Sequence, residues 1–254
     1  MGISPILAPI LGGMLAAEEV WKLLFLIMAI VSGLGLIGCL TVLPEGKLPE
    51  LHKRLNTLSI GKAYLACVRN PGFVNFALVR AISNSAAFSF VTASPFVFME
   101  LYHLSKQNYG FLFSSGAFGM ISMGLLNTKL LHFYKIKTIT RFAIAFQVIV
   151  GLFIVLGVYL HADIIVMAIL LFLFLSMLGL ILPNATALYL ASTSAHAGAA
   201  SAVIGSLSYL SAFLITSLLT LMHNFTAYPM VITMLVCSLT ALVLLNLDLS
   251  KKRT

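Results

Sequence analysis

Residues 164–190 read IIVMAILLFLFLSMLGLILPNATALYL and open a longer run, 164–247, that contains no Asp, Glu, Lys or Arg. A helix needs about 20 apolar residues to cross the hydrocarbon core of a bilayer. The run is too long for one crossing, so uncharged turns must divide it. Small polar residues and His gather near 192–196 and 223–226, and such clusters favour turns. We therefore expect three spans, near 164–190, 198–222 and 227–247.

The composition of the 254-residue chain agrees with this interpretation, because 61% of the residues are hydrophobic, 9% are charged and the mean hydropathy is +1.08. A soluble domain carries about 25% charged residues, and a disordered chain has far fewer apolar side chains. Continuous apolar runs also differ from the alternating pattern of a transmembrane barrel. The sequence predicts an all-α, polytopic transmembrane helical bundle.

Four more windows are long enough to cross a membrane. Residues 23–44, 107–128 and 142–162 contain no Asp, Glu, Lys or Arg, and 71–99 is interrupted only by Arg80. Residues 2–17 are apolar but too short for a full crossing, so we interpret them as the last part of a helix whose beginning is missing. The expected total is about eight spans, one of them partial.

Basic residues gather in alternate connections between these spans. One group lies in 45–70, a second between the spans 107–128 and 142–162, and a third after the last span, whereas the other connections hold only Lys22 and Lys106. Cytoplasmic loops carry the excess of Lys and Arg in membrane proteins. These three segments and the C-terminus are therefore predicted to be cytoplasmic. The same loops account for the net charge of +8, and we expect no nucleic-acid partner.

The sequence offers little that could support catalysis or metal binding. All seven acidic residues lie in loops or at span ends, the six His are scattered, and the three Cys are far apart without a CxxC pair. Hydrolytic and metal sites need carboxylates, His or Cys at close spacing. We expect neither an enzyme nor a metal site nor a cofactor.

Arg80 is the one charged residue well inside a span, and Asn84 follows it on the same helical face. Charge at that depth costs about 2.5–3.5 kcal/mol on insertion scales, so Arg80 should face a bundle interior or a wet cavity. Two interpretations stay open: Arg80 lines a substrate cavity, or it reaches the headgroups or braces a neighbouring helix.

Pro183 and Asn184 lie inside the span 164–190. Proline removes one backbone hydrogen bond of a helix, so a bend is expected there. Bends of this kind occur in gating or binding helices of transporters.

Three segments resemble a known family. Residues 4–13, SPILAPILGG, resemble the fifth-helix antiporter motif of major facilitator drug exporters, with Pro9, Gly12 and Gly13 in place and Ala8 where glycine is usual. Residues 94–102, SPFVFMELY, beginning with Ser94 and Pro95, resemble the seventh-to-eighth helix signature of the bicyclomycin/chloramphenicol resistance (Bcr/CflA) subfamily. Residues 182–185, LPNA, followed by His196 and Gly198, resemble its tenth-to-eleventh helix signature.

The resemblance implies a monomeric, proton-coupled drug efflux antiporter of the bacterial inner membrane that works by alternating access, with small-molecule drugs and protons as its partners in the bilayer. It maps the chain onto helices five to twelve. Residues 1–44 would end the N-terminal helical half, 45–70 would be the cytoplasmic loop between the halves, and 71–254 would form the C-terminal six-helix half. The cavity would include Arg80, Asn84, Phe88 and Asn184.

Two family features have no counterpart here: the acidic residue of the first helix, and the charged loop between helices two and three. We therefore expect a chain that lacks the N-terminal helices and that inserts into the membrane without exchanging drug for protons. The alternative is a non-transporting polytopic membrane protein or a degenerate gene product.

The distribution of basic residues leads to a topology test. In a variant stripped of Cys39, Cys67 and Cys237, single cysteines at 53 and 135 should resist an impermeant thiol reagent in intact cells, while a cysteine at 106 reacts. Labelling of lysed cells is the control for reactivity. Blocked labelling at 106 with open labelling at 53 would reverse the predicted orientation.

Overall fold

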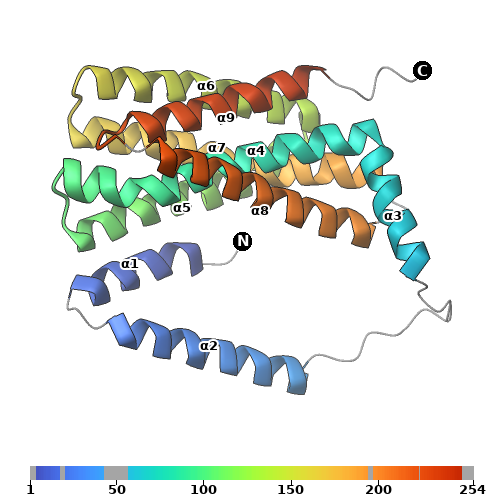
Figure 1. The fold of residues 1–254 in the computed structure, drawn as a ribbon, viewed down its shortest axis with the longest axis horizontal. Coiled ribbons are helices and arrows are strands. Elements are labelled where there is room, and N and C mark those ends of the chain that lie inside the picture. The colour runs from blue at the N-terminus through green and yellow to red at the C-terminus, as the bar shows by residue number, and fades with distance from the viewer. Residues whose placement is uncertain (1–3, 18–20, 43–56, 194–196, 223, 248–254) are drawn as a thin grey trace.

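The computed structural model describes residues 4–17, 21–42, 57–193, 197–222 and 224–247. The elements in these ranges are helices lying side by side (Figure 1), so the all-α fold class is confirmed. In chain order they are α1 (Ser4–Ala17), α2 (Trp21–Val42), α3 (Thr57–Arg69), α4 (Pro71–Pro95), the π-helix η1 (Phe96–Leu101), α5 (Lys106–Leu130), α6 (Ile136–Tyr159), α7 (Ile164–Ser192), α8 (Ala197–Leu221) and α9 (Tyr228–Leu247).

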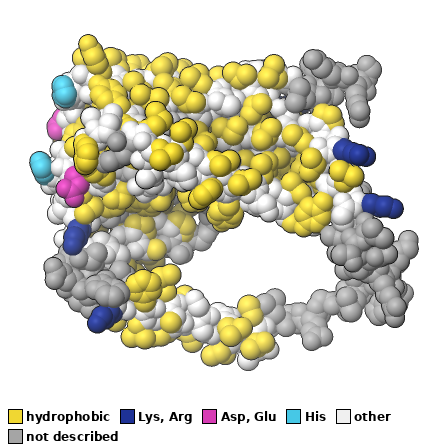
Figure 2. Space-filling model, viewed as in Figure 1, with side chains coloured by type: hydrophobic (Ala, Val, Ile, Leu, Met, Phe, Trp, Pro, Cys, Tyr) yellow, Lys and Arg dark blue, Asp and Glu magenta, His cyan; other side chains and the backbone are white. Residues whose placement is uncertain are grey.

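In the described part of the chain, seven helical stretches are long and apolar enough to cross a membrane, and a shorter apolar helix lies at Pro5–Met14. This confirms the seven complete spans that the sequence predicts and their order, and it places a short apolar helix where the partial span is expected. Figure 2 shows the reason in space: hydrophobic side chains cover much of the visible flank of the bundle, whereas the coloured charged and His side chains lie at its two ends. Such a surface matches a hydrocarbon core between two polar boundaries.

The bounds of two expected spans differ from the structure. α6 starts at Ile136 instead of residue 142, so Lys137 and Arg141 lie in its first two turns. The charges do not break the helix, because side chains near a helix end can extend to the polar boundary; the Nζ of Lys137 lies 5.1 Å from the ring centroid of Phe76. The span expected at 71–99 consists of α4 and η1, in which the hydrogen-bond pattern widens after Pro95.

α4 lies among three other long helices. It packs against α7, α8 and α9, while α6 packs against α7 and α9, α5 against α7, and α1 against α5. One apolar core lies toward η1 and includes Phe90, Phe98 and Met230, and a second lies toward α3 and includes Phe73 and Ile181. α2 contacts α1, and its described side chains are largely exposed at some distance from the bundle (Figure 1).

α5 and α7 approach each other closely at glycines. A Cβ on Gly179 would collide with the backbone carbonyl of Met120, and Gly119 lies against the side chains of Ser176 and Phe172. Small residues let helix backbones meet in lipid, where association depends on van der Waals contact. The distance between α5 and α7 is therefore set by residues that have almost no side chain.

This contact predicts a position-specific loss of stability. Gly179→Ala should lower the melting temperature of the detergent-solubilised protein by an amount equivalent to about 1–3 kcal/mol, because neither backbone can move freely away from the new methyl group. Gly33→Ala in α2 is the matched control, since a Cβ there has no neighbour within 4 Å. Equal melting temperatures for the two variants would contradict the close contact.

Candidate functional site

Arg80 joins three helices inside the bundle. It lies nine residues after Pro71, the first residue of α4, or about 14 Å along the helix axis at 1.5 Å per residue. Its Nε donates a hydrogen bond of 2.9 Å to Oγ1 of Thr186 on α7, and its Nη1 donates one of 2.9 Å to Oγ of Ser208 on α8. The charge is thus held by two hydroxyl groups from neighbouring helices.

Thr186 is well placed as an acceptor because its own proton is used elsewhere. Its hydroxyl donates to the carbonyl oxygen of Leu182, one turn earlier in α7, at 2.7 Å. A hydroxyl with its proton committed keeps its lone pairs for the guanidinium. α4 and α8 are connected again further along, where the hydroxyls of Ser85 and Ser211 lie 3.1 Å apart.

Arg80 lines a cavity of about 330 Å³. The other walls come from α5 and α7, namely Met120, Ile121, Gly124, Leu125, Gly179, Leu182, Pro183 and Thr186. This volume falls at the lower end of the range for small-molecule pockets, which typically combine apolar walls with a few polar groups. The apolar walls, one cation and one hydroxyl define a candidate pocket for a small amphipathic molecule, hereafter the Arg80 pocket.

Arg80 both braces neighbouring helices and lines a cavity, so two of the roles considered for it occur together. The hydrogen bonds to Thr186 and Ser208 brace α7 and α8, and the same side chain forms part of a cavity wall. Bracing and cavity formation are compatible because a guanidinium has five N–H donors, of which the structure uses two.

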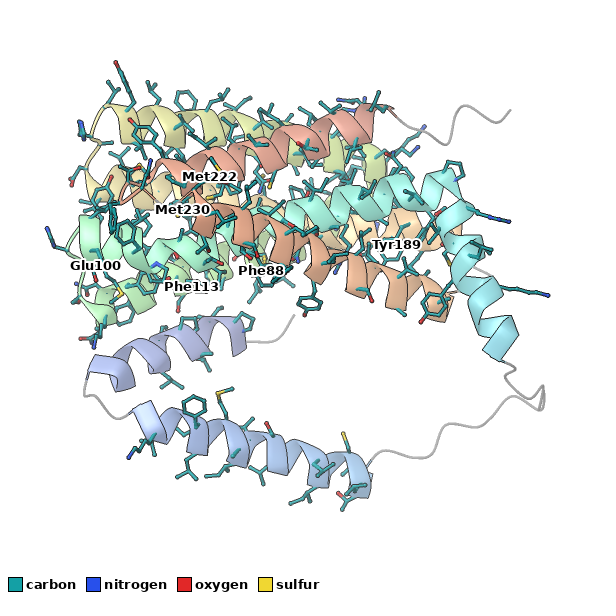
Figure 3. All side chains as sticks on the ribbon, in the orientation of Figure 1. Phe88, Glu100, Phe113, Tyr189, Met222 and Met230 are labelled. Atoms are coloured by element: carbon teal, nitrogen blue, oxygen red, sulfur yellow. The ribbon has the colours of Figure 1, made fainter. Side chains whose placement is uncertain are left out.

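Asn84 and Phe88 lie one and two turns beyond Arg80 on α4, and both are half-buried. The ring of Phe88, which is labelled in Figure 3, packs edge-to-face against Tyr209 of α8, and the two ring centroids lie 6.2 Å apart. Neither residue belongs to the wall of the Arg80 pocket. The structure therefore places them on the α4 face that continues from the pocket, and their part in a cavity stays a prediction.

The side chain of Asn184, which the resemblance places in the cavity, pairs with the side chain of Asn127. Its Nδ2 donates to Oδ1 of Asn127 on α5 at 2.8 Å, and Nδ2 of Asn127 donates back at 2.9 Å. Both side chains are buried. Asn184 thus links α5 to α7 beside the Arg80 pocket, whose wall takes its neighbours Pro183 and Thr186 instead.

Sequence reasoning missed Asn127, Thr186 and Ser208. A polar residue inside an apolar span is a recognisable signal, and Asn127 carries it, although its position near a span end makes it look like a cap. Thr and Ser are common in membrane helices, so nothing in the sequence separates Thr186 and Ser208 from the other hydroxyl residues.

The antiporter-motif residues lie where α1 meets α5. A Cβ on Gly13 would lie 2.9 Å from the carbonyl oxygen of Lys106, and one on Gly110 would lie 2.6 Å from that of Pro9. The hydroxyl of Ser114 donates to the carbonyl oxygen of Ile6 at 2.8 Å. Beside this contact is a cavity of about 510 Å³, lined by Pro9, Gly12, Gly13, Val91, Met99, Lys106, Tyr109, Gly110 and Phe113.

The signature residues of the η1 region hold the end of α4. The hydroxyls of Ser94 and Tyr109 lie 2.8 Å apart, and Pro95 is the last residue of α4 before η1. Beyond η1, the hydroxyl of Tyr102 donates to the carbonyl oxygen of Ala162 at 3.2 Å. Burial and the charge of Asp163 raise the pKa of Tyr102.

Two of the remaining signature residues lie in α7 and α8. Pro183 lies inside α7, and Gly198 lies in the first turn of α8 with open space around its Cα. His196 lies outside the described residues. Among the described residues, no group of three or more His, Cys, Asp or Glu gathers to hold a metal ion.

Membrane-spanning helices that line a small, partly open pocket fit the architecture of a polytopic membrane transport protein. The profile of the Major Facilitator Superfamily matches residues 1–216. The chain belongs to this superfamily of membrane transporters, whose members are generally not enzymes.

Individual relatives agree with this membership. The chain is 27% identical, over 235 residues, to the bicyclomycin resistance protein homolog of Haemophilus influenzae, an alignment that covers 92% of this chain and 59% of the relative. It is 25% identical over 233 residues to an uncharacterized MFS-type transporter of Bacillus subtilis, with 90% and 57% covered. It is 25% identical over 124 residues to the multidrug transporter MdfA of Edwardsiella ictaluri, with 49% and 30% covered. The chain thus spans less than two thirds of the length of these relatives, and its resemblance to the bicyclomycin/chloramphenicol resistance subfamily is confirmed.

The asparagine pair yields a stability test. Asn127→Leu and Asn184→Leu should each lower the melting temperature in detergent, because each leaves one buried amide without its partner. The double variant should lose less than the sum, with a coupling of about 0.6–1.7 kcal/mol, the range of polar contacts in membrane helices. Strictly additive losses would show that the two amides do not stabilise each other.

Proposed function

We propose that the chain forms part of a proton-coupled drug efflux antiporter of the bacterial inner membrane, working by alternating access. The observation that carries the proposal is the Arg80 pocket, where α4, α5 and α7 line a small, partly open and mostly apolar space beside a fixed charge. An ionisable residue well inside a membrane span is by default a functional-site hypothesis. The names of the Haemophilus and Edwardsiella relatives, which refer to bicyclomycin resistance and multidrug transport, support a drug as the cargo.

In this proposal the residues of the pocket have separate roles. Met120, Ile121 and Leu125 of α5 and Leu182 of α7 form the apolar walls that contact the drug. Arg80 orients its polar part, while Thr186 and Ser208 hold the guanidinium in place. Asn84 and Phe88 continue the same surface along α4, and Asn184 acts through Asn127 by fixing α5 against α7.

The contact between α1 and α5 supports alternating access. α1 and α5 meet through the glycines Gly13 and Gly110, where backbone approaches backbone without intervening side chains. Transporters of this kind work by rocking one helical bundle against another around a central site. We assign α1 and α2 to one bundle and α4–α9 to the other, so that the α1–α5 contact is where the two bundles move against each other.

The proton requires a titratable group that both states can reach. Glu100 is the only Asp or Glu in the described helices, and it lies near the end of η1 (Figure 3). A carboxylate outside these helices, or a histidine such as His161 or His196, therefore has to carry the proton. In the proposed topology the C-terminus is cytoplasmic and the protein works as a monomer.

Drug accumulation in a pump-deficient bacterium tests the proposal. The chain is expressed alone and fused to the part of the Haemophilus relative with which it does not align, and cell-associated drug is measured. The fusion should lower accumulation and lose this effect when a protonophore collapses the proton gradient, whereas the chain alone should leave accumulation unchanged. A membrane-inserted fusion without any effect on accumulation would refute the proposed function.

Substituting the central arginine tests the role of the pocket. Arg80→Leu in the fusion should abolish export while membrane insertion is retained, because the drug loses its polar contact and α7 and α8 lose their brace. Arg141→Leu is the matched control, since Arg141 is exposed near the start of α6. Undiminished export by Arg80→Leu would show that export needs neither a contact between Arg80 and the drug nor the brace that Arg80 provides.

A further inference from the structure

The charges around the Arg80 pocket have a single sign. Arg80 carries a fixed positive charge about 14 Å into α4. The other charged side chains of the described spans lie within two turns of a helix end. No Asp or Glu occurs in 71–99 or in 164–247, which include the parts of α4, α7 and α8 that surround the guanidinium. The pocket therefore has a positive potential that no carboxylate of these segments neutralises.

The partners of Arg80 are neutral. Thr186 and Ser208 accept hydrogen bonds from Nε and Nη1 but carry no charge. Three of the five N–H donors of the guanidinium remain for a ligand. A guanidinium fork is well suited to a carboxylate, which can accept two parallel hydrogen bonds from it.

The rest of the cavity fits an apolar body of limited size. Its volume is about 330 Å³, and its walls include the side chains of Met120, Ile121, Leu125 and Leu182. Gly124 and Gly179 also line the cavity, at the place where the backbones of α5 and α7 meet. A molecule with one ring system and one acidic group would place the ring against these walls and the acid on Arg80.

We propose that the Arg80 pocket selects organic anions, that is, small amphipathic molecules with a carboxylate, over neutral molecules and lipophilic cations. The inference rests on the proposed function and specifies its substrate class. Coulomb interactions are much stronger in a low-dielectric site than in water. A carboxylate therefore stabilises the arginine, whereas an ammonium group at the same position is repelled.

Binding to the purified full chain in lipid nanodiscs tests this selectivity without requiring transport. Three probes with the same ring, naphthylacetate, naphthylacetamide and naphthylethylammonium, are titrated by calorimetry. Naphthylacetate should bind at least about tenfold more tightly than naphthylacetamide, as expected for charge-assisted hydrogen bonds. Naphthylethylammonium should bind more weakly still.

Variants assign the selectivity to the arginine. Arg80→Met, which keeps an apolar stem but loses the charge, should remove the preference for naphthylacetate over naphthylacetamide, because neither probe then meets a cation in the pocket. Arg80→Lys should keep part of the preference, since the charge stays but the fork is lost. Arg141→Met removes an exposed positive charge elsewhere and should change none of the three affinities.

Three results would overturn the inference: equal affinities of the wild-type chain for the three probes, no saturable binding of any probe, or a preference for the carboxylate that survives Arg80→Met. Failure of the proposed function is seen separately. Selective binding of naphthylacetate by a protein whose fusion exports no drug would uphold the inference and refute the transport role, and export of cations unaffected by Arg80→Met would do the reverse.

Discussion

The close backbone contact between α5 and α7 is the constraint on which the rest of the bundle depends. Lipid supplies no hydrophobic force that drives one apolar helix against another, so helices in a bilayer associate through packing and polar contacts. Gly179 lies against the backbone carbonyl of Met120, and Gly119 lies against the side chains of Ser176 and Phe172. This contact fixes the separation of two helices, and the Arg80 pocket lies beside it, with Gly124 and Gly179 in its wall.

Polar contacts inside the bundle extend this arrangement to the other helices. The Asn127–Asn184 pair joins α5 and α7, and Gln147 of α6 donates to the carbonyl oxygen of Phe174 at 3.1 Å while it accepts from Ser238 of α9 at 3.3 Å. Arg80 joins α4 to α7 and α8. Because an unsatisfied polar group is costly in hydrocarbon, each contact selects one arrangement of neighbours among the many that apolar packing would allow.

The pocket follows from the same contacts. A guanidinium that donates to Thr186 and Ser208 is held at the wall of the pocket instead of extending to the nearest polar boundary, and Gly124 and Gly179 of the α5–α7 contact line the same pocket. A stabilising brace and a ligand-binding group are thus the same side chain. The two hydrogen bonds of Arg80 offset part of the cost of placing a charge inside the bundle. The same residue links the packing of the helices to the proposed selectivity for anions.

The sequence by itself determined the spans and the family. Apolar length decides whether a segment crosses a bilayer, and this is a local property, so the charge-free run 164–247 could be divided at its polar turns into the helices α7, α8 and α9 that the structure contains. Motifs such as SPILAPILGG and SPFVFMELY are local as well. The depth of Arg80 could also be foreseen, because it depends only on the distance from the end of its helix.

Only the tertiary structure decided what Arg80 and Asn184 contact. The hydrogen-bond partners of Arg80 lie more than one hundred residues away in the chain, and hydroxyl residues are too common in the spans for the sequence to single out Thr186 and Ser208. The resemblance to the family predicts Asn184 in the cavity, and only the structure shows that its side chain contacts Asn127 of α5. The rotation of a helix about its axis is set by the packing of all its neighbours, and an apolar span has little amphipathic pattern that would reveal it.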